Sequence, residues 1–264
     1  MLYFESKAVT DVGNKRTVNQ DSYIEIRNYV NDKYVGLFCV ADGMGGLSDG
    51  EYASTLATSM STEWYRSNLE ILSKKKINEN RLKKDLKELF FSINEKIYIY
   101  GKEKNIKVGT TYSLLLLIDN KYYVVHAGDS RIYMKRKDKL FMLTKDQTWV
   151  NDQVEKGLMS AEQALHHPKK NVLANCMGCF ENPSICMGNG KVELNDTFLL
   201  CSDGLYNLMT IDEISRGMSC ENLDYISMEM LSTVKDRGGF DNITMLIVKA
   251  ISPLSIEATT VDLG

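Results

Sequence analysis

Short apolar runs joined by tight turns constrain the fold of this chain more than any other feature of its sequence. Residues 110–118 and 122–126 are rich in aromatic, β-branched and aliphatic side chains, and they flank the polar triplet Asp119-Asn120-Lys121. This pattern predicts a β-hairpin. Residues 131–134 and 140–143 flank a second polar turn in the same way. Successive hairpins favour antiparallel sheets covered by helices over a repeating β-α-β pattern.

Apolar patterning elsewhere predicts further strands and helices. Continuous apolar runs indicate buried strands at residues 34–40, 197–201 and 243–248. Apolar residues at helical spacing indicate helices within residues 52–64, 82–97 and 223–234. Residues 146–175 are more polar and less periodic, and we expect them to form a peripheral, partly helical excursion.

Composition favours one globular domain. Hydrophobic residues make up 44% of the 264 positions and charged residues 25%, which excludes a disordered chain, a collagen and a coiled coil. Only 3 prolines occur, so a proline-rich linker between domains is excluded.

Charge and hydropathy narrow the class of partners. The 32 basic and 35 acidic side chains give a formal charge of -3, which lacks the basic excess typical of nucleic-acid-binding proteins. Residues 1–7 lack the basic start and apolar run of a signal peptide. The longest aliphatic run, residues 114–118, is far shorter than the roughly 20 residues that a membrane-spanning helix needs. We therefore expect a soluble, cytoplasmic protein without nucleic-acid or membrane partners.

Six cysteines raise the question of zinc or disulfides. Cys176 and Cys179 form a CxxC motif with Cys186 nearby, but no second CxxC follows, and His166 and His167 lie about ten residues upstream. A zinc site is therefore the weaker hypothesis. A chain of this length needs no disulfides for its core, and we expect reduced thiols that act as small apolar side chains.

Five aspartates occupy predicted strand ends or turns: Asp21, Asp42, Asp129, Asp203 and Asp241. One Asp-Gly pair is usually only a turn signal, but the joint placement points to a site, because loops at strand ends present functional groups. Carboxylates that converge repel one another unless cations bind between them. Oxygen ligands select hard ions such as Mg²⁺ or Mn²⁺.

Gly43 and Arg16 suggest that the site acts on phosphoryl groups. Gly43 follows Asp42 and has no side chain to keep a cation away from its carbonyl oxygen. Two ions that share one carboxylate could activate a bridging water for attack on a phosphoryl group. Arg16 could bind phosphate oxygens in a bidentate manner, although this segment alone would favour an exposed surface arginine.

An ordered set of motifs connects these residues. The sequence resembles the metal-dependent Ser/Thr protein phosphatases of type 2C, most closely their bacterial branch. The matching motifs span about residues 7–248 and lie at residues 13–21, 41–46, 109–111, 127–131, 143–146, 167–168, 201–205 and 241–244.

The resemblance implies an α+β fold. It is a four-layer αββα sandwich, in which two antiparallel sheets pack together and are flanked by helices. The implied organisation is a single catalytic domain over residues 1–250, with a flap subdomain at residues 146–175 beside the active site. Residues 251–264 would form a short C-terminal tail.

The resemblance also implies metal ligands. Asp42 would bridge two Mn²⁺ or Mg²⁺ ions, and the carbonyl of Gly43 would bind one of them. Asp203 and Asp241 would complete the coordination of the first ion. Asp21 would act on the metals through a bound water.

Further roles follow by position. Arg16 would hold the substrate phosphate. Asp129, together with Asp203, would serve the weaker third metal found in many relatives. Asn207 stands where some relatives place another carboxylate, which weakens the expectation of that third site.

The general acid is not assigned by the resemblance. Animal members carry a histidine after the Asp-Gly pair, whereas this chain has Met44, as bacterial relatives do. His126 is the nearest candidate by strand position, and we expect it to be buried in its strand rather than catalytic.

The function implied is metal-dependent hydrolysis of phosphoserine and phosphothreonine on proteins, by a monomeric bacterial signalling enzyme that opposes a Ser/Thr kinase. The alternative is a catalytically weak or inactive relative that binds phosphoproteins through the same fold. All core positions are present, including Asp42, Asp203 and Asp241, which favours the active enzyme.

Overall fold

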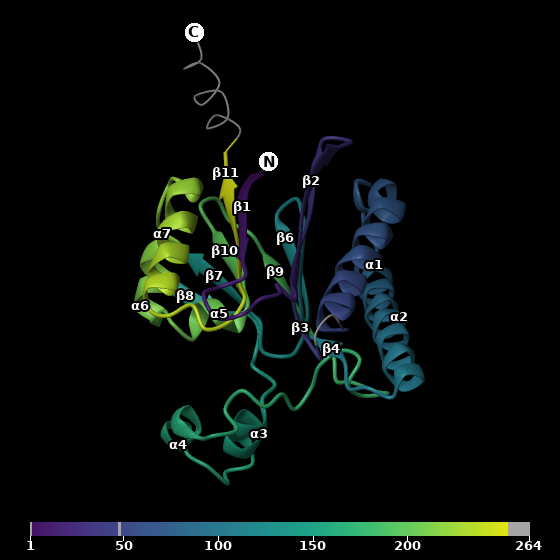
Figure 1. Ribbon diagram of the computed structural model, residues 1–264. Coiled ribbons are helices and arrows are strands. Elements are labelled where there is room, and N and C mark those ends of the chain that lie inside the picture. The colour runs from purple at the N-terminus through teal and green to yellow at the C-terminus, as the bar shows by residue number, and fades with distance from the viewer. Residues whose placement is uncertain (1, 47–48, 253–264) are drawn as a thin grey trace.

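Two antiparallel sheets lie face to face in the computed structural model, which describes residues 2–46 and 49–252 (Figure 1). The first sheet has the order β1 (Tyr3–Asp11), β11 (Ile243–Ile251), β10 (Thr197–Cys201), β7 (Arg131–Arg136) and β8 (Lys139–Met142). The second has the order β2 (Asp21–Val30), β3 (Lys33–Met44), β5 (Tyr112–Ile118), β6 (Lys121–Ala127) and β9 (Cys186–Lys191), with β4 (Gly109–Thr110) paired to β3.

Helices cover both outer faces of the sandwich (Figure 1). The second sheet is covered by α1 (Asp49–Leu72) and α2 (Glu79–Lys104), and the first by α5 (Asp203–Tyr206), α6 (Ile211–Gly217) and α7 (Leu223–Asp236). Two short helices, α3 (Trp149–Glu155) and α4 (Ala161–His166), lie apart from the sheets at one end of the sandwich. The predicted fold class is confirmed. Within the described ranges, no helix is both long and apolar enough to cross a bilayer.

Burial on both faces explains why β3 reads as a continuous apolar run. Leu37 and Cys39 belong to the cluster under α1 and α2, whereas Phe38 and Val40 belong to the cluster between the two sheets. Alternate residues of a strand point to opposite faces, so a strand between helices and a second sheet needs apolar residues at every position. A third cluster lies between the first sheet and α7.

The end of β3 differs from the sequence prediction. The apolar run predicted a strand over residues 34–40, but the strand continues through Met44. Gly43 pairs with Thr110, and Met44 pairs with Gly109. A distant segment thus supplies the ladder hydrogen bonds that keep these residues extended, which local composition does not reveal.

Several elements were not predicted: β1, β2, β9, α5 and α6. The strand β9 has the sequence Cys-Met-Gly-Asn-Gly-Lys, which has low strand propensity. It forms because it completes the edge of the second sheet, where Cys186 to Lys191 pair with β6.

The expectation of reduced thiols is wrong for one pair, because Cys176 and Cys179 form a disulfide. The two residues bracket a turn in which Met177 makes a β-bridge to Thr110, and this turn brings the sulfurs together. Cys186 remains a free thiol. Among the described residues, no three His, Cys, Asp or Glu side chains are grouped as a metal site, so the zinc hypothesis finds no support.

Candidate active site

Two of the predicted aspartates lie opposite each other on adjacent strands. Asp21 begins β2 and is the register partner of Asp42, near the end of β3. Directly opposed carboxylates are unfavourable in an antiparallel pair, so this arrangement is typical of a functional site rather than of a stable sheet.

Backbone hydrogen bonds hold Asp42 from the side of β4. Its carbonyl accepts from the amide of Thr111 at 2.9 Å and from the hydroxyl of Thr110 at 3.0 Å. Its own amide donates to the Thr111 hydroxyl at 2.8 Å. Both threonines lie in the motif at residues 109–111, to which the sequence assigns no role, and the structure places them as the support of Asp42.

Gly43 is required by close packing. A Cβ at this position would lie 2.1 Å from the carbonyl oxygen of Gly50 and 2.6 Å from that of Gln20. Any side chain would therefore push the first turn of α1 away from the strand. Only glycine lets the helix start beside this carbonyl group.

Asp203 and Asp241 come together through a second glycine contact. Asp203 is the first residue of α5, and Asp241 precedes β11. A Cβ on Gly204 would lie 1.9 Å from the carbonyl oxygen of Asn242, so the absence of a side chain lets α5 pack directly on the loop that carries Asp241.

Asn242 fastens the loop that carries Arg16. Its side-chain amide donates to the carbonyls of Val12 and Val18, each at 3.0 Å, and its side-chain oxygen accepts from the amide of Gln20 at 2.9 Å. This role was missed from sequence, because an Asp-Asn pair before a strand reads only as a turn. Arg16 extends from that loop.

Arg16 pairs with an expected metal ligand. Its Nη2 lies 2.8 Å from Oδ2 of Asp241, and this contact raises the pKa of the guanidinium. About half of the Arg16 side chain remains exposed. The guanidinium carries five N–H groups, so it can contact a phosphate while it keeps the Asp241 contact.

Asp21 is a buried carboxylate. The hydroxyl of Ser202 donates to its Oδ2 at 2.8 Å, whereas its buried Oδ1 has no hydrogen-bond partner. The pKa of Asp21 is raised to about 7, mainly by burial and also by the charges of Asp203 and Asp241, against the opposing effect of hydrogen bonds from Thr244 and Ser202. A buried polar atom without a partner calls for an explanation, such as a water or an ion.

The five aspartates interact electrostatically as one group. Burial raises the pKa of Asp42 well above its ordinary value, and the charges of Asp21, Asp203, Asp129 and Asp241 add to this shift. Burial, with the nearby charge of Asp241, raises the pKa of Asp203 to about 6. Burial, with the charge of Asp203, raises the pKa of Asp129 to about 8. A bound cation would remove this repulsion.

Asp129 lies on the side of the flap. It lines a cavity of about 300 Å³ between the sandwich and the helices α3 and α4, together with Arg131, Asp146 and Tyr206. Asn207 donates to Oδ2 of Asp203 at 3.1 Å, so at this position an amide stands beside a carboxylate.

The donor set fits hard divalent cations in its chemistry. It consists of carboxylates and a backbone carbonyl, and it contains an unpartnered oxygen on Asp21. The pKa values of Asp21, Asp42 and Asp203 are raised in the way that a cation would reverse. In residues 2–46 and 49–252, however, no three of the carboxylates are gathered closely enough to hold an ion.

No general acid is found at the position of Met44 or in His126, the candidate by strand position. Met44 has no titratable group, and it lies beside Cys179. His126 is fully buried, its Nδ1 lies 2.9 Å from Ser113 Oγ, and its Nε2 lies 3.0 Å from the carbonyl of Lys145. Burial lowers the pKa of His126 to about 4. The expectation that His126 is a buried strand residue agrees with this geometry.

The family is shown by comparison with known proteins. Residues 8–157, more than half of the chain, match the model of the protein phosphatase 2C family. The protein phosphatase PhpP of Streptococcus pneumoniae is 32% identical over 247 residues, which cover 92% of this chain and 96% of PhpP. The serine/threonine phosphatase stp of Listeria monocytogenes is 30% identical over 243 residues, covering 91% and 93%. This chain belongs to the protein phosphatase 2C family.

Solved structures agree with this assignment. The serine/threonine phosphatase of S. agalactiae superposes with a TM-score of 0.82 at 30% identity, over 93% of this chain and 99% of that one. The catalytic domain of PstP, solved in complex with two manganese ions, superposes with a TM-score of 0.77 at 26% identity, over 96% and 100%.

Proposed function

We propose that this chain is a bacterial metal-dependent phosphatase that hydrolyses phosphoserine and phosphothreonine on proteins. Membership of the protein phosphatase 2C family makes it a phosphoric monoester hydrolase, and its bacterial relatives are named as Ser/Thr phosphatases. The observation that carries the proposal is the direct opposition of Asp21 and Asp42 on adjacent strands, with a buried oxygen of Asp21 left without a hydrogen-bond partner. The inactive alternative has no support from these relatives.

The predicted metal ligands would supply the hydrolytic chemistry through the ions that they bind. Asp42, the Gly43 carbonyl, Asp203 and Asp241 would hold two Mn²⁺ or Mg²⁺ ions, a choice supported by the two manganese ions of PstP. When bound, the ions would lower the pKa of a water that attacks phosphorus and would neutralise charge on the phosphoryl group. Asp129 would serve a third, weaker ion.

Arg16 would act on the phosphate of the substrate, and Asp21 would act on the attacking water. Arg16 would bind two phosphate oxygens and orient the phosphoryl group, because a guanidinium matches that geometry in a bidentate manner. Asp21 would accept a hydrogen bond from the attacking water through Oδ1, the oxygen without a protein partner. The Ser202 hydroxyl keeps the carboxylate turned so that this oxygen stays available.

We further propose one catalytic domain over residues 1–250, with residues 146–175 as a flap that influences substrate choice and residues 251–264 as a tail. Residues 253–264 of that tail lie outside the described residues. Phosphoproteins are the proposed substrates, and a Ser/Thr kinase of the same cell is the proposed counterpart. The protein would work in the cytoplasm as a monomer.

Hydrolysis of a phosphothreonine peptide, with and without Mn²⁺, tests the proposal. Mn²⁺ should activate release of phosphate, and a chelator should abolish it. Asp42→Asn should lose at least about 100-fold in kcat, about 2.7 kcal/mol of transition-state stabilisation. Asp138→Asn, at an exposed turn between β7 and β8, is the matched control and should retain full activity. Full activity in chelator, or in Asp42→Asn, would overturn the two-metal assignment.

A further inference from the structure

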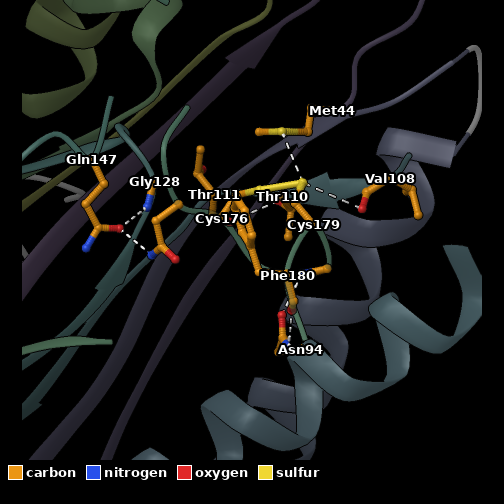
Figure 2. Close-up of a disulfide and its surroundings, with 12 residues drawn as sticks. Met44, Asn94, Val108, Thr110, Thr111, Gly128, Gln147, Cys176, Cys179 and Phe180 are labelled. Atoms are coloured by element: carbon orange, nitrogen blue, oxygen red, sulfur yellow. Dashed lines mark hydrogen bonds between the residues drawn. A yellow bond between two sulfur atoms is a disulfide. The ribbon is translucent and has the colours of Figure 1, made fainter. Parts of the chain in front are cut away.

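The disulfide between Cys176 and Cys179 has no part in the hydrolysis proposed above, yet it lies next to the end of β3, which carries Asp42 and Gly43. Figure 2 shows it beside Thr110 and Met44, above the helix that carries Asn94. The Cα atoms of the two cysteines are 6.0 Å apart, within the usual range for a disulfide.

The two sulfurs differ in access to solvent. Cys176 is 1% exposed, whereas Cys179 is an exposed residue. Thiol–disulfide exchange requires access to the sulfur under attack. An external thiolate can therefore reach only Cys179, and Cys176 is the sulfur that leaves. This one-sided access is what a disulfide that exchanges with external thiols requires.

The turn stays closed without help from the disulfide. The amide of Gly178 donates to Asn94 Oδ1 at 2.7 Å, and Asn94 Nδ2 donates to the carbonyls of Phe180 at 3.0 Å and Glu181 at 3.2 Å. A Cβ on Gly178 would lie 2.2 Å from Ile97, so the turn packs tightly on α2. A cross-link that closes a loop of only two intervening residues removes little entropy from the unfolded chain. Stabilising the fold is therefore a poor reason for this disulfide.

Hydrogen bonds connect this turn to the end of β3, which carries Asp42 and Gly43. Met177, between the two cysteines, exchanges two hydrogen bonds of 3.0 Å with Thr110. Thr110 in turn pairs with Gly43, and its hydroxyl donates to the carbonyl of Asp42. One residue therefore links the disulfide turn to both the bridging carboxylate and the carbonyl ligand.

The sulfur of Cys179 also lies close to Gly109, which precedes Thr110, and to Met44, which follows Gly43. A Cβ on Gly109 would lie 2.5 Å from Sγ of Cys179, so the disulfide occupies the space that a side chain would take. Sγ of Cys179 is 3.9 Å from Met44 Sδ and 3.9 Å from the carbonyl oxygen of Val108. Reduction would move the sulfurs to nonbonded distance, against Gly109 and Met44, and the new thiol of Cys179 could donate to Val108.

We propose that Cys176 and Cys179 form a reversible redox site that exchanges with thiols of low molecular weight, and that its oxidised form binds the catalytic Mn²⁺ more tightly than its dithiol form. A thiolate attacks Sγ of Cys179 and releases Cys176 as a thiolate, which takes up a proton. A second thiol then displaces Cys179, so two thiols become one small disulfide and the protein gains two thiols. The coupling to Mn²⁺ rests on the proposed function, whereas the thiol exchange does not.

Equilibration of the full chain with glutathione tests the redox site. Free thiols are alkylated after equilibration at a series of ratios of reduced to oxidised glutathione, and the mass of the peptide that contains both cysteines is measured. We expect conversion of this pair from disulfide to dithiol as the ratio rises. A pair that stays oxidised in reduced glutathione alone, or stays reduced in oxidised glutathione alone, would overturn the proposal.

Calorimetric titration with Mn²⁺ tests the coupling. The Kd of the dithiol form should exceed that of the disulfide form by roughly threefold to tenfold, at or below the 10- to 100-fold effect of losing a direct outer-sphere partner. Cys179→Ser cannot form the disulfide, so its Kd should equal that of the dithiol form under both oxidising and reducing conditions. If this variant folds poorly, Cys176→Ser provides the same test. Cys220→Ser, a free cysteine between α6 and α7, should behave as the wild type.

The outcomes separate the two proposals. Equal Kd values in both redox forms would disprove the coupling. Absence of phosphatase activity in both forms, with the glutathione titration as expected, would disprove the proposed function and leave the redox site standing.

Discussion

Ser202 donates its hydroxyl proton to Oδ2 of Asp21 at 2.8 Å and accepts a hydrogen bond from the amide of Thr244 at 3.0 Å. Ser202 follows β10 of the first sheet, and Asp21 begins β2 of the second. One hydroxyl therefore joins the two sheets beside Asp21. It also determines which oxygen of Asp21 is left for a cation or a water.

Ser202→Ala should destabilise the protein and weaken Mn²⁺ binding. The change leaves Oδ2 of Asp21 and the amide of Thr244 without this partner, and an unsatisfied buried polar group costs about 1–3 kcal/mol. Chemical denaturation and calorimetric titration with Mn²⁺ measure the two effects. Ser227→Ala is the matched control, since Ser227 is also buried but bonds only within α7, to Asp224. Equal losses in the two variants would show that the Asp21 contact has no special role.

Arg16→Ala should mainly raise KM for phosphopeptides, by roughly tenfold, because it removes a charged phosphate donor outside the metal ligands. Arg16→Lys should recover part of this loss, since lysine keeps the charge but not the bidentate geometry. Steady-state kinetics separate KM from kcat. Arg66→Ala, on the exposed face of α1, is the control for loss of one positive charge. Unchanged kinetics in Arg16→Ala would reassign Arg16 to the surface.

His126 should make the fold sensitive to acid. Its folded pKa of about 4 lies below its ordinary value of 6.5, so the unfolded chain binds the proton more readily. The free energy of unfolding should therefore fall as pH drops from about 6.5 to about 4, by at most about 3 kcal/mol.

The raised pKa values of Asp21 and Asp129 act in the opposite direction, because their folded forms bind protons more readily and lose stability as pH rises. Both the wild type and His126→Gln contain Asp21 and Asp129, so the difference between their free energies of unfolding cancels the contributions of these two aspartates. The stability of the wild type relative to the variant should decrease across that pH window in chemical denaturation. A constant difference would mean that His126 does not titrate as its burial implies.

Asp146→Asn should loosen the flap. Asp146 accepts from Arg131 Nε at 2.9 Å and Nη2 at 2.6 Å, and the guanidinium lies 3.6 Å from the centre of the Tyr206 ring. Loss of the charged acceptor should cost about 2 kcal/mol and speed amide hydrogen exchange in α3. Asp152→Asn breaks an exposed pair with Lys156 and should cost less than about 0.5 kcal/mol. Equal exchange rates in α3 in both variants would contradict the role of the Arg131 contact.

Local patterning predicted the parts of the fold that depend on local preference. The hairpin of β5 and β6, the strand β10 and the helices α1, α2 and α7 follow from apolar periodicity and turn residues. The extension of β3 through Gly43, and the strand β9, depend on hydrogen-bonding partners that are distant in sequence, so composition alone did not predict them.

The same division holds for the site. The sequence by itself determined the chemistry, since five aspartates at strand ends, Gly43 and Arg16 are the donor types that hard cations and phosphate require. Only the tertiary structure decided that Ser202 holds Asp21, that Asn242 fastens the loop of Arg16, and that Cys176 is bonded to Cys179. These contacts depend on where distant segments pack, and local sequence carries no information about that packing.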